Sequence, residues 1–195
     1  MESVYFESQN TSFALFGRII FDSKLSESHY STDRILEKLA VVRWFDEDTL
    51  RNYIHTDEVS PLLKKIKSLS YVERRNFGFS FHDIMREEIC RDIFAKSPSN
   101  FKKLNVLAAD YYRERINRSS RLLSQTLIIE MAYHLILGDE DKGFFEINRL
   151  IISRDEIFQP YLCDAIIETV NGMNLKPDNL ALLNKWKKTI NSNKN

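Results

Sequence analysis

Residues 71–94 read YVERRNFGFSFHDIMREEICRDIF, and the periodicity of this stretch changes once, at His82. Before His82, two short segments (72–75 and 77–81) alternate in polarity around an asparagine and a glycine, a pattern typical of a β-hairpin. After it, apolar residues recur at helical spacing, and Asp83 is expected to cap the first turn. The expected inner side of this helix comprises Ile84, Met85, Ile89, Ile93 and Phe94. The sequence therefore predicts a hairpin that runs directly into a helix.

Three short helical patterns precede the hairpin. The first begins near Thr32, the second follows Asp46, which is a strong cap, and the third begins at Ser60-Pro61. Their expected inner positions are Ile35, Leu36, Leu39, Ala40 and Val42, then Leu50, Tyr53 and Ile54, then Leu62, Leu63, Ile66 and Leu69. Three helices, a small hairpin and a long helix are the layout of a winged helix-turn-helix domain, which we assign to residues 32–96.

The rest of the chain is also helical in pattern. Ser97-Pro98-Ser99 interrupts it, and amphipathic segments then follow one another almost to the end of the sequence. Their expected inner positions include Phe101, Leu104, Leu107, Ala108, Tyr111, Tyr112, Phe144, Phe145, Ile147, Leu162, Ile166, Val170, Leu180, Leu183 and Trp186. Tight turns between successive helices predict antiparallel helical hairpins of the tetratricopeptide (TPR) kind in residues 97–195, although no strict repeat is present. Residues 1–31 form a separate N-terminal segment with an apolar helix at about 13–21.

Composition limits the class of protein. Among 195 residues, 28 lysines and arginines balance 28 aspartates and glutamates, so no overall field draws the chain to nucleic acid or an acidic membrane. The most apolar segment, 127–137, is interrupted by Glu130 and His134 and is too short to span a bilayer. The two cysteines, Cys90 and Cys163, lie in apolar helical patterns and are expected to be reduced core residues. We expect a mainly α-helical cytoplasmic protein that does not associate with membranes.

No residue pattern indicates an active site. The four histidines, His29, His55, His82 and His134, are scattered, with no HExxH and no cysteine–histidine cluster, so no metal site is expected. His134 is more typical of a satisfied, partly buried histidine than of a ligand. No GxxxxGK[ST] phosphate loop and no GxSxG elbow occur. The chain is therefore expected not to be an enzyme and to hold no cofactor by itself.

A cluster of basic residues leaves one alternative open. The third helix would be the recognition helix of a DNA-binding winged helix, and the basic residues on it and on the hairpin are Lys64, Lys65, Lys67, Arg74 and Arg75. They could contact phosphates. We prefer the interpretation that they are the solvated surface of a helix, because the helix lacks the asparagine, glutamine or arginine residues that read base edges, and Glu73 interrupts the hairpin.

Several segments resemble signal-transducing STAND NTPases, the group that includes NB-ARC-type and MalT-like regulators. FSFHDIMRE (79–87) looks like the motif that closes their winged helix, and FKKLNVLAADYY (101–112) resembles the helix that leads into their helical repeats. EMAYHL (130–135) with Gly138-Asp139 is similar to the first repeat hairpin. NTSFALFGR (10–18) faintly resembles the lid helix, without the glycine and proline usual there.

The resemblance implies a regulatory role for the chain. The histidine of this motif contacts the phosphate of a bound nucleotide in that family, so His82 would be a nucleotide sensor, and residues 1–31 would be lid-like. ATP or ADP would bind only with an NTPase domain supplied elsewhere, because the phosphate loop is missing. The expected partner is a protein or the missing NTPase domain, whose site His82 could complete. DNA is the alternative partner.

Overall fold

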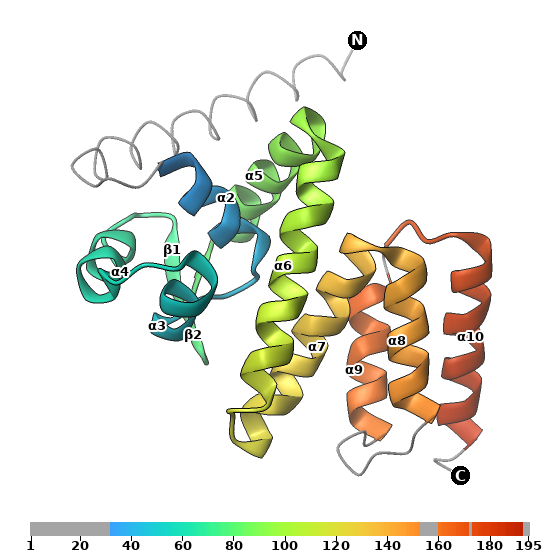
Figure 1. Ribbon diagram of the computed structural model, residues 1–195. Helices are drawn as coiled ribbons and strands as arrows, with labels where there is room; N and C mark the ends of the chain where they lie inside the picture. Colours follow the sequence, from blue (N-terminus) through green and yellow to red (C-terminus); the bar gives the residue numbers. More distant parts are fainter. Residues whose placement is uncertain (1–31, 153–159, 172, 193–195) are drawn as a thin grey trace. The chain divides into compact units, whose positions relative to one another are not determined.

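A computed structural model of the chain describes residues 32–152, 160–171 and 173–192 (Figure 1). The described residues are mainly helical, with one small two-stranded antiparallel sheet. The expectations for the N-terminal segment 1–31, including its helix and its lid-like part, lie outside the described residues.

The chain divides into two compact units, residues 1–101 and residues 102–195. Within the ranges that the structure describes, no helix is long and apolar enough to cross a membrane.

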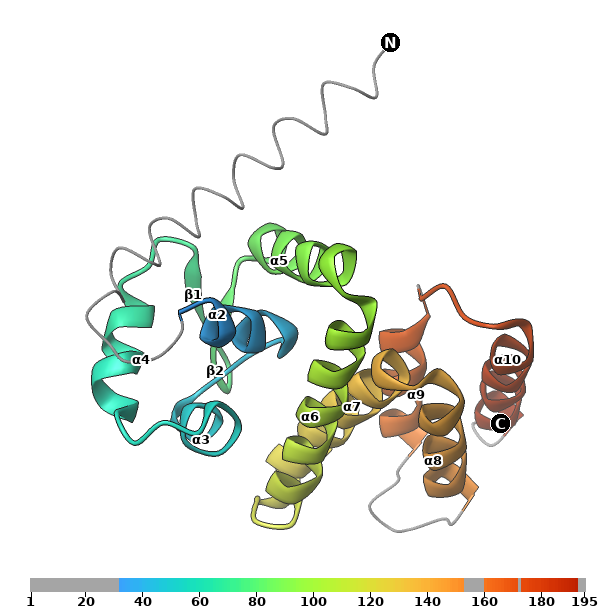
Figure 2. The ribbon, with the colours of Figure 1, turned by 45° about the horizontal axis from the view of Figure 1, so that its top comes forward.

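The first unit consists of short helices around a hairpin (Figure 2). Its elements are α2 (Thr32–Val41), α3 (Glu47–Thr49), the π-helical turn η1 (Leu50–Ile54), α4 (Val59–Lys67), β1 (Val72–Arg75), β2 (Gly78–Phe81) and α5 (Asp83–Lys96). The predicted cap at Asp46 is confirmed as a capping box: Asp46 Oδ1 accepts from the Thr49 amide at 3.0 Å, and Thr49 Oγ1 accepts from the Asp46 amide at 3.2 Å. The π-helical turn ends at His55, whose φ of 63° lies in the left-handed region.

The predicted hairpin that runs into a helix is confirmed. β1 and β2 pair antiparallel from Val72 opposite Phe81 to Arg75 opposite Gly78. The extended chain at Phe45 joins the far edge of β2, because Phe45 and Phe79 exchange two backbone hydrogen bonds of 2.7 and 2.8 Å. A Cβ at position 78 would collide with the Phe45 carbonyl oxygen, so this close approach requires glycine.

The cap of α5 differs from the prediction. The N-cap residue is His82, with φ −51° and ψ 140°, and Asp83 is already inside the first turn. No side-chain hydrogen bond caps this end of the helix. The prediction of Asp83 as the cap was wrong. β2 ends at Phe81 and α5 begins at Asp83, so His82, whose amide still donates to the Tyr71 carbonyl at 2.9 Å, occupies the N-cap position.

The buried apolar residues of the first unit come from α2, η1, α4, α5, the hairpin and the segments between them. The predicted inner positions of the three helices before the hairpin are all buried: Ile35, Leu36, Leu39, Ala40, Val42, Leu50, Tyr53, Ile54, Leu62, Leu63, Ile66 and Leu69. On α5, Ile89 and Ile93 are buried as predicted, but Ile84 is 72% exposed and Phe94 51% exposed. The helical spacing of Ile84 and Phe94 predicted that they would be buried with Ile89 and Ile93. They are exposed because α2 covers only one side of α5.

The cysteines occupy different environments. Cys163 is buried, whereas Cys90 is half-buried and its Sγ lies 3.4 Å from the Ala40 carbonyl oxygen, which it donates to. Loss of hydration raises the pKa of the Cys90 thiol to about 11. Both thiols are free.

The second unit consists of helices that alternate in direction along the chain (Figure 1). Its elements are α6 (Pro98–Ile116), which begins at the end of the first unit, α7 (Arg121–Gly138), α8 (Glu140–Ile152), α9 (Pro160–Val170) and α10 (Pro177–Ser192). Four of them, α7 to α10, share a core of Ile128, Ala132, Ile136, Phe144, Ile147, Leu162, Cys163, Ile166, Ile167, Val170, Leu183 and Trp186. Three predicted inner positions are exposed instead: Leu107 (51%), Phe145 (71%) and Leu180 (46%).

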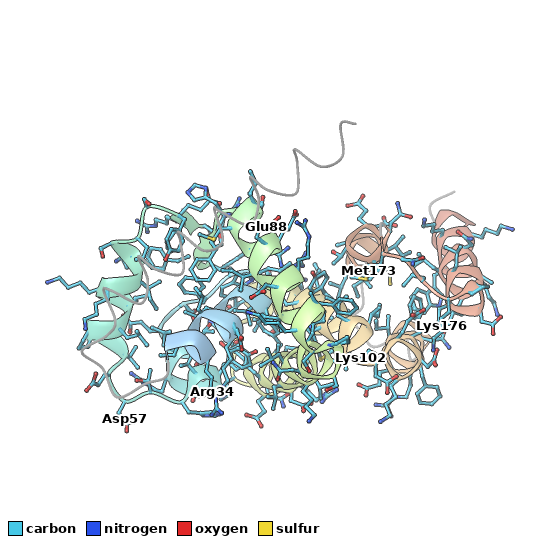
Figure 3. The ribbon with its side chains drawn as sticks, turned by 90° about the horizontal axis from the view of Figure 1, so that it is seen from above. Arg34, Asp57, Glu88, Lys102, Met173 and Lys176 are labelled. Atoms are coloured by element: carbon cyan, nitrogen blue, oxygen red, sulfur yellow. The ribbon has the colours of Figure 1, made fainter. Side chains whose placement is uncertain are left out.

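Polar side chains fix α8 beside α10. Asn179 Nδ2 donates to Glu140 Oε1 at 2.8 Å near the start of both helices, and Trp186 Nε1 donates to Asn148 Oδ1 at 2.9 Å further along. The pairs are 39 and 38 residues apart in the sequence, so the two helices run in the same direction. Lys176, labelled in Figure 3, adds an ion pair of 2.5 Å to Asp141.

Candidate functional site

His82 is the residue that the sequence singles out, and it lies where β2 ends and α5 begins. Its backbone amide is bound to the Tyr71 carbonyl, and its carbonyl accepts the first helical hydrogen bond of α5, from Arg86, at 3.0 Å. The backbone is therefore fixed on both sides, while the imidazole is 52% exposed. The side chain projects from a rigid junction into solvent, beside the amide groups of a helix N-terminus.

A carboxylate of the hairpin lies near this imidazole. Glu73 Oε2 lies 3.8 Å from His82 Nδ1, and the other carboxylate oxygen of Glu73 pairs with Arg75. Arg75 also donates from Nε to Ser80 Oγ at 3.1 Å and lies 3.7 Å from Asp83 Oδ1. The group thus contains one guanidinium and two carboxylates beside the imidazole of His82.

The predicted basic residues differ in their exposure and in their contacts. Lys64 and Lys67 are exposed on α4 and Lys65 is half-buried. The ammonium group of Lys67 lies 4.9 Å from the centre of the Phe79 ring, a cation–π contact. On β1, Arg74 is exposed, whereas Arg75 is already paired with Glu73 and Asp83.

This arrangement permits contact with an anion and does not by itself make a catalytic site. An imidazole at a helix N-terminus can donate a hydrogen bond to a phosphate, which the helix end also attracts. The carboxylates of Glu73 and Asp83 oppose such binding unless Arg75 compensates them, as its contacts with both permit. In the described part of the chain, no group of histidine, cysteine, aspartate and glutamate side chains is arranged to hold a metal ion.

Several polar side chains are buried in the second unit, and little in the local sequence pattern indicated their burial. They include Asn105, Arg115, Glu130 and His134. Asn105 Oδ1 lies 2.8 Å from His134 Nδ1, and the imidazole stacks on the Tyr112 ring at a centroid distance of 5.5 Å. His134 is thus fully buried, beyond the partial burial predicted. The one available signal was that Asn105 lies one residue from Leu104 and three from Ala108, on the apolar side of α6.

Comparison with known proteins gave no match: no protein-family model, no curated protein and no solved structure matches the chain.

Proposed function

We propose that the chain is a non-catalytic regulatory and protein-interaction module of the STAND type. In this proposal residues 32–96 are a winged helix that couples the nucleotide state of an NTPase domain to a helical sensor region, residues 97–195. The observation that carries the proposal is the half-exposed imidazole of His82, held at a rigid junction between a hairpin and a helix N-terminus.

Connectivity supports the winged helix. The order is helix, extended segment at Phe45, two helices, hairpin, helix, and Phe45 pairs with the outer edge of β2. Phe45, in the extended segment between α2 and α3, therefore lies at the edge of β2 that does not pair with β1. The hairpin is thereby anchored to the helices rather than projecting freely.

Regular spacing supports a TPR-like second region. The α6–α8 ion pair, Arg113 to Glu146 at 2.8 Å, spans 33 residues, and the α8–α10 bond from Trp186 to Asn148 spans 38. Therefore α8 lies beside α6, and α10 lies beside α8, after similar lengths of chain. This arrangement is typical of stacked helical hairpins.

The experiment is to recover the tagged full chain from its source cells with ATP or with ADP present, and to identify the retained proteins by mass spectrometry. We expect an ATPase with a phosphate loop whose retention depends on the nucleotide. The nucleotide affinity of that ATPase is then measured with the wild-type chain and with His82→Ala. Loss of one hydrogen bond to a charged phosphate, worth about 1.5–3 kcal/mol, should weaken binding about tenfold or more.

The matched control is His55→Asn, which removes the other described histidine of the first unit at a left-handed position that asparagine tolerates. It should leave the nucleotide affinity unchanged. Failure to recover any phosphate-loop ATPase, or an affinity unaffected by His82→Ala, would contradict the proposal.

DNA binding through α4 is the second candidate, favoured by the exposure of Lys64, Lys67 and Arg74. If it operates, affinity for duplex DNA falls steeply with salt and drops in the Lys64→Ala, Lys65→Ala, Lys67→Ala triple variant. The pairing of Arg75 with Glu73 and Asp83 weighs against it, because these carboxylates repel phosphates. Negligible binding to duplex at low salt would eliminate this candidate.

A further inference from the structure

One side of α5 carries two large apolar side chains that are exposed. Ile84 is 72% exposed and Phe94 is 51% exposed, whereas Ile89 on the opposite side is buried. Glu87 and Arg91, which are also exposed, lie between Ile84 and Phe94 at helical spacing. The two apolar residues are ten positions apart, which is about 15 Å along a helix. The exposed side of α5 therefore has an apolar residue at each end and charged residues in the middle.

Both apolar residues have fixed positions. Ile84 lies in the first turn of α5, directly after the junction that the hairpin holds. The Phe94 ring meets the Phe101 ring edge-on, with 5.7 Å between their centres, where α5 turns into α6. Among the described residues of the first unit, the other exposed large apolar side chain is Phe77, which lies beside Trp44 on the hairpin. The exposed apolar surface of this unit is thus concentrated on α5.

The same chain contains an apolar segment of similar length. Residues 13–21 read FALFGRIIF, and Arg18 is the one charged residue among them. A helix that is apolar on nearly all sides is found covered by other parts of a protein. Nine helical residues extend over about 13 Å, which is close to the separation of Ile84 and Phe94 along α5. The segment and the exposed side of α5 therefore match in length and in apolar character.

The chain between them is long enough to join them. Residues 22–31, DSKLSESHYS, lead from the apolar segment to the start of α2 at Thr32. α2 packs against α5, where the Cys90 thiol donates to the Ala40 carbonyl at 3.4 Å. The path from Thr32 to Ala40 is about 12 Å along α2, and that from Cys90 to Ile84 is about 9 Å along α5. Ten extended residues span up to about 33 Å, which exceeds this path.

Tethering and charge favour this segment over a separate protein as the occupant. A short connection gives the segment an effective concentration of roughly millimolar at the surface of α5, which a dilute partner does not reach. Arg91 is paired with Glu88, and the exposed carboxylate of Glu87 lies in the middle of the same side. Its charge is opposite to that of Arg18.

We propose that residues 13–21 pack along the exposed side of α5, between Ile84 and Phe94, with Arg18 beside Glu87. The chain then supplies its own cover for this side, and a partner protein meets the segment rather than α5. The inference goes beyond the function proposed above, because it uses neither His82 nor nucleotide.

The test attaches a spin label to Ser12→Cys in the full chain and records backbone amide signals by NMR. Cys90 and Cys163 react slowly with the label, because burial raises the pKa of both thiols and the thiolate is the reactive form. We expect loss of the amide signals of residues 84–94 on α5. The signals of α4, in the same unit, should persist and serve as the internal control.

Ile84→Ser should restore the α5 signals, because it removes the most exposed apolar contact of that side. The matched control is Phe145→Ser, which changes an equally exposed apolar residue of the second unit and should leave the loss unchanged. Both side chains are exposed, so circular dichroism and thermal midpoints should stay close to wild type.

Three outcomes overturn the inference. The first is α5 signals that the label leaves intact, and the second is a loss that Ile84→Ser does not reverse. The third is a loss that arises when the label and the isotope are on different chains of a mixture, which would mean that a second copy covers α5.

Discussion

Asn105 Oδ1 lies 2.8 Å from His134 Nδ1, and both side chains are completely buried between α6 and α7. The contact joins residues 29 positions apart in the sequence. The Tyr112 ring stacks on the same imidazole, with 16° between the planes. A hydrogen bond of this kind has a fixed length and direction, so it sets how the two helices pack against each other more narrowly than apolar contacts do.

The first prediction concerns this pair. Asn105→Leu should lower the free energy of unfolding by about 1–3 kcal/mol, because it removes the hydrogen-bond partner of a buried imidazole nitrogen. His134→Leu should cost a similar amount. The double variant should lose less than the sum of the two, because neither partner is then left buried alone. Urea unfolding followed by circular dichroism measures all four proteins. Strict additivity would show that the two side chains contribute separately.

The second prediction concerns the close approach at the hairpin. Gly78→Ala places a methyl group against the Phe45 carbonyl, which is backbone bound to Phe79 and cannot rotate away. We expect a loss of about 1–3 kcal/mol, similar to overpacking of a core. Gly138→Ala is the informative comparison, because its nearest obstacle is the Val106 side chain, 2.8 Å away. Val106→Ala should partly rescue Gly138→Ala, whereas no side-chain truncation should rescue Gly78→Ala. Equal tolerance of alanine at both glycines would contradict this explanation.

Local signals in the sequence were sufficient to predict the hairpin and the helix that follows it. The change of periodicity at His82 and the cap at Asp46 depend on neighbouring residues alone, and both the hairpin and the capping box are present. Exposure was harder to predict. Ile84, Phe145 and Leu180 have the same spacing as buried residues of their helices, and only the positions of neighbouring helices determine that they remain uncovered.

The candidate site could be predicted only in part for the same reason. His82 could be identified from the sequence because its position between the hairpin and the helix depends on neighbouring residues alone. Its environment depends on Glu73 and Arg75, which reach it only because β1 pairs with β2 in one particular register. The burial of Asn105 and His134 requires two helices to meet, and a polar residue within an apolar pattern does not reveal where its partner lies.

The third prediction concerns His55, the described non-glycine residue with positive φ. Its φ of 63° and ψ of 53° cost a side chain with a Cβ about 1 kcal/mol relative to glycine. His55→Gly should therefore raise the free energy of unfolding by roughly 0.5–1 kcal/mol, a gain that the greater flexibility of the unfolded chain partly offsets. His55→Val should lower it, because β-branched residues tolerate this region least. Thermal unfolding ranks the three proteins, and a valine variant as stable as the glycine variant would show that the backbone is not strained there.

The fourth prediction concerns the ion pair between α8 and the start of α10. Hydrogen bonds from Lys176 and then Asn179 hold the pKa of the Asp141 carboxyl below its ordinary value of 3.8, and the Asp141 carboxylate raises the pKa of Lys176 above 10.5. A carboxyl with a lowered pKa stabilises the fold fully above its ordinary value, and this contribution is lost as the pH falls through the lowered value. A lysine with a raised pKa contributes fully below its ordinary value, and its contribution is lost as the pH rises through the raised one.

Lys176→Met should therefore lower the thermal midpoint at neutral pH, and its difference from the wild type should shrink at acidic pH as Asp141 becomes protonated. Because both side chains are more than half exposed, the effect is small and should also shrink in high salt. Lys142→Met is the matched control: its ammonium group lies 3.9 Å from Asp139 and its side chain is 80% exposed, so the midpoint should hardly change. A difference between Lys176→Met and the wild type that stays constant from neutral to strongly acidic pH would show that Lys176 acts through packing of its methylene chain, because only the ionic contact depends on the charge of Asp141.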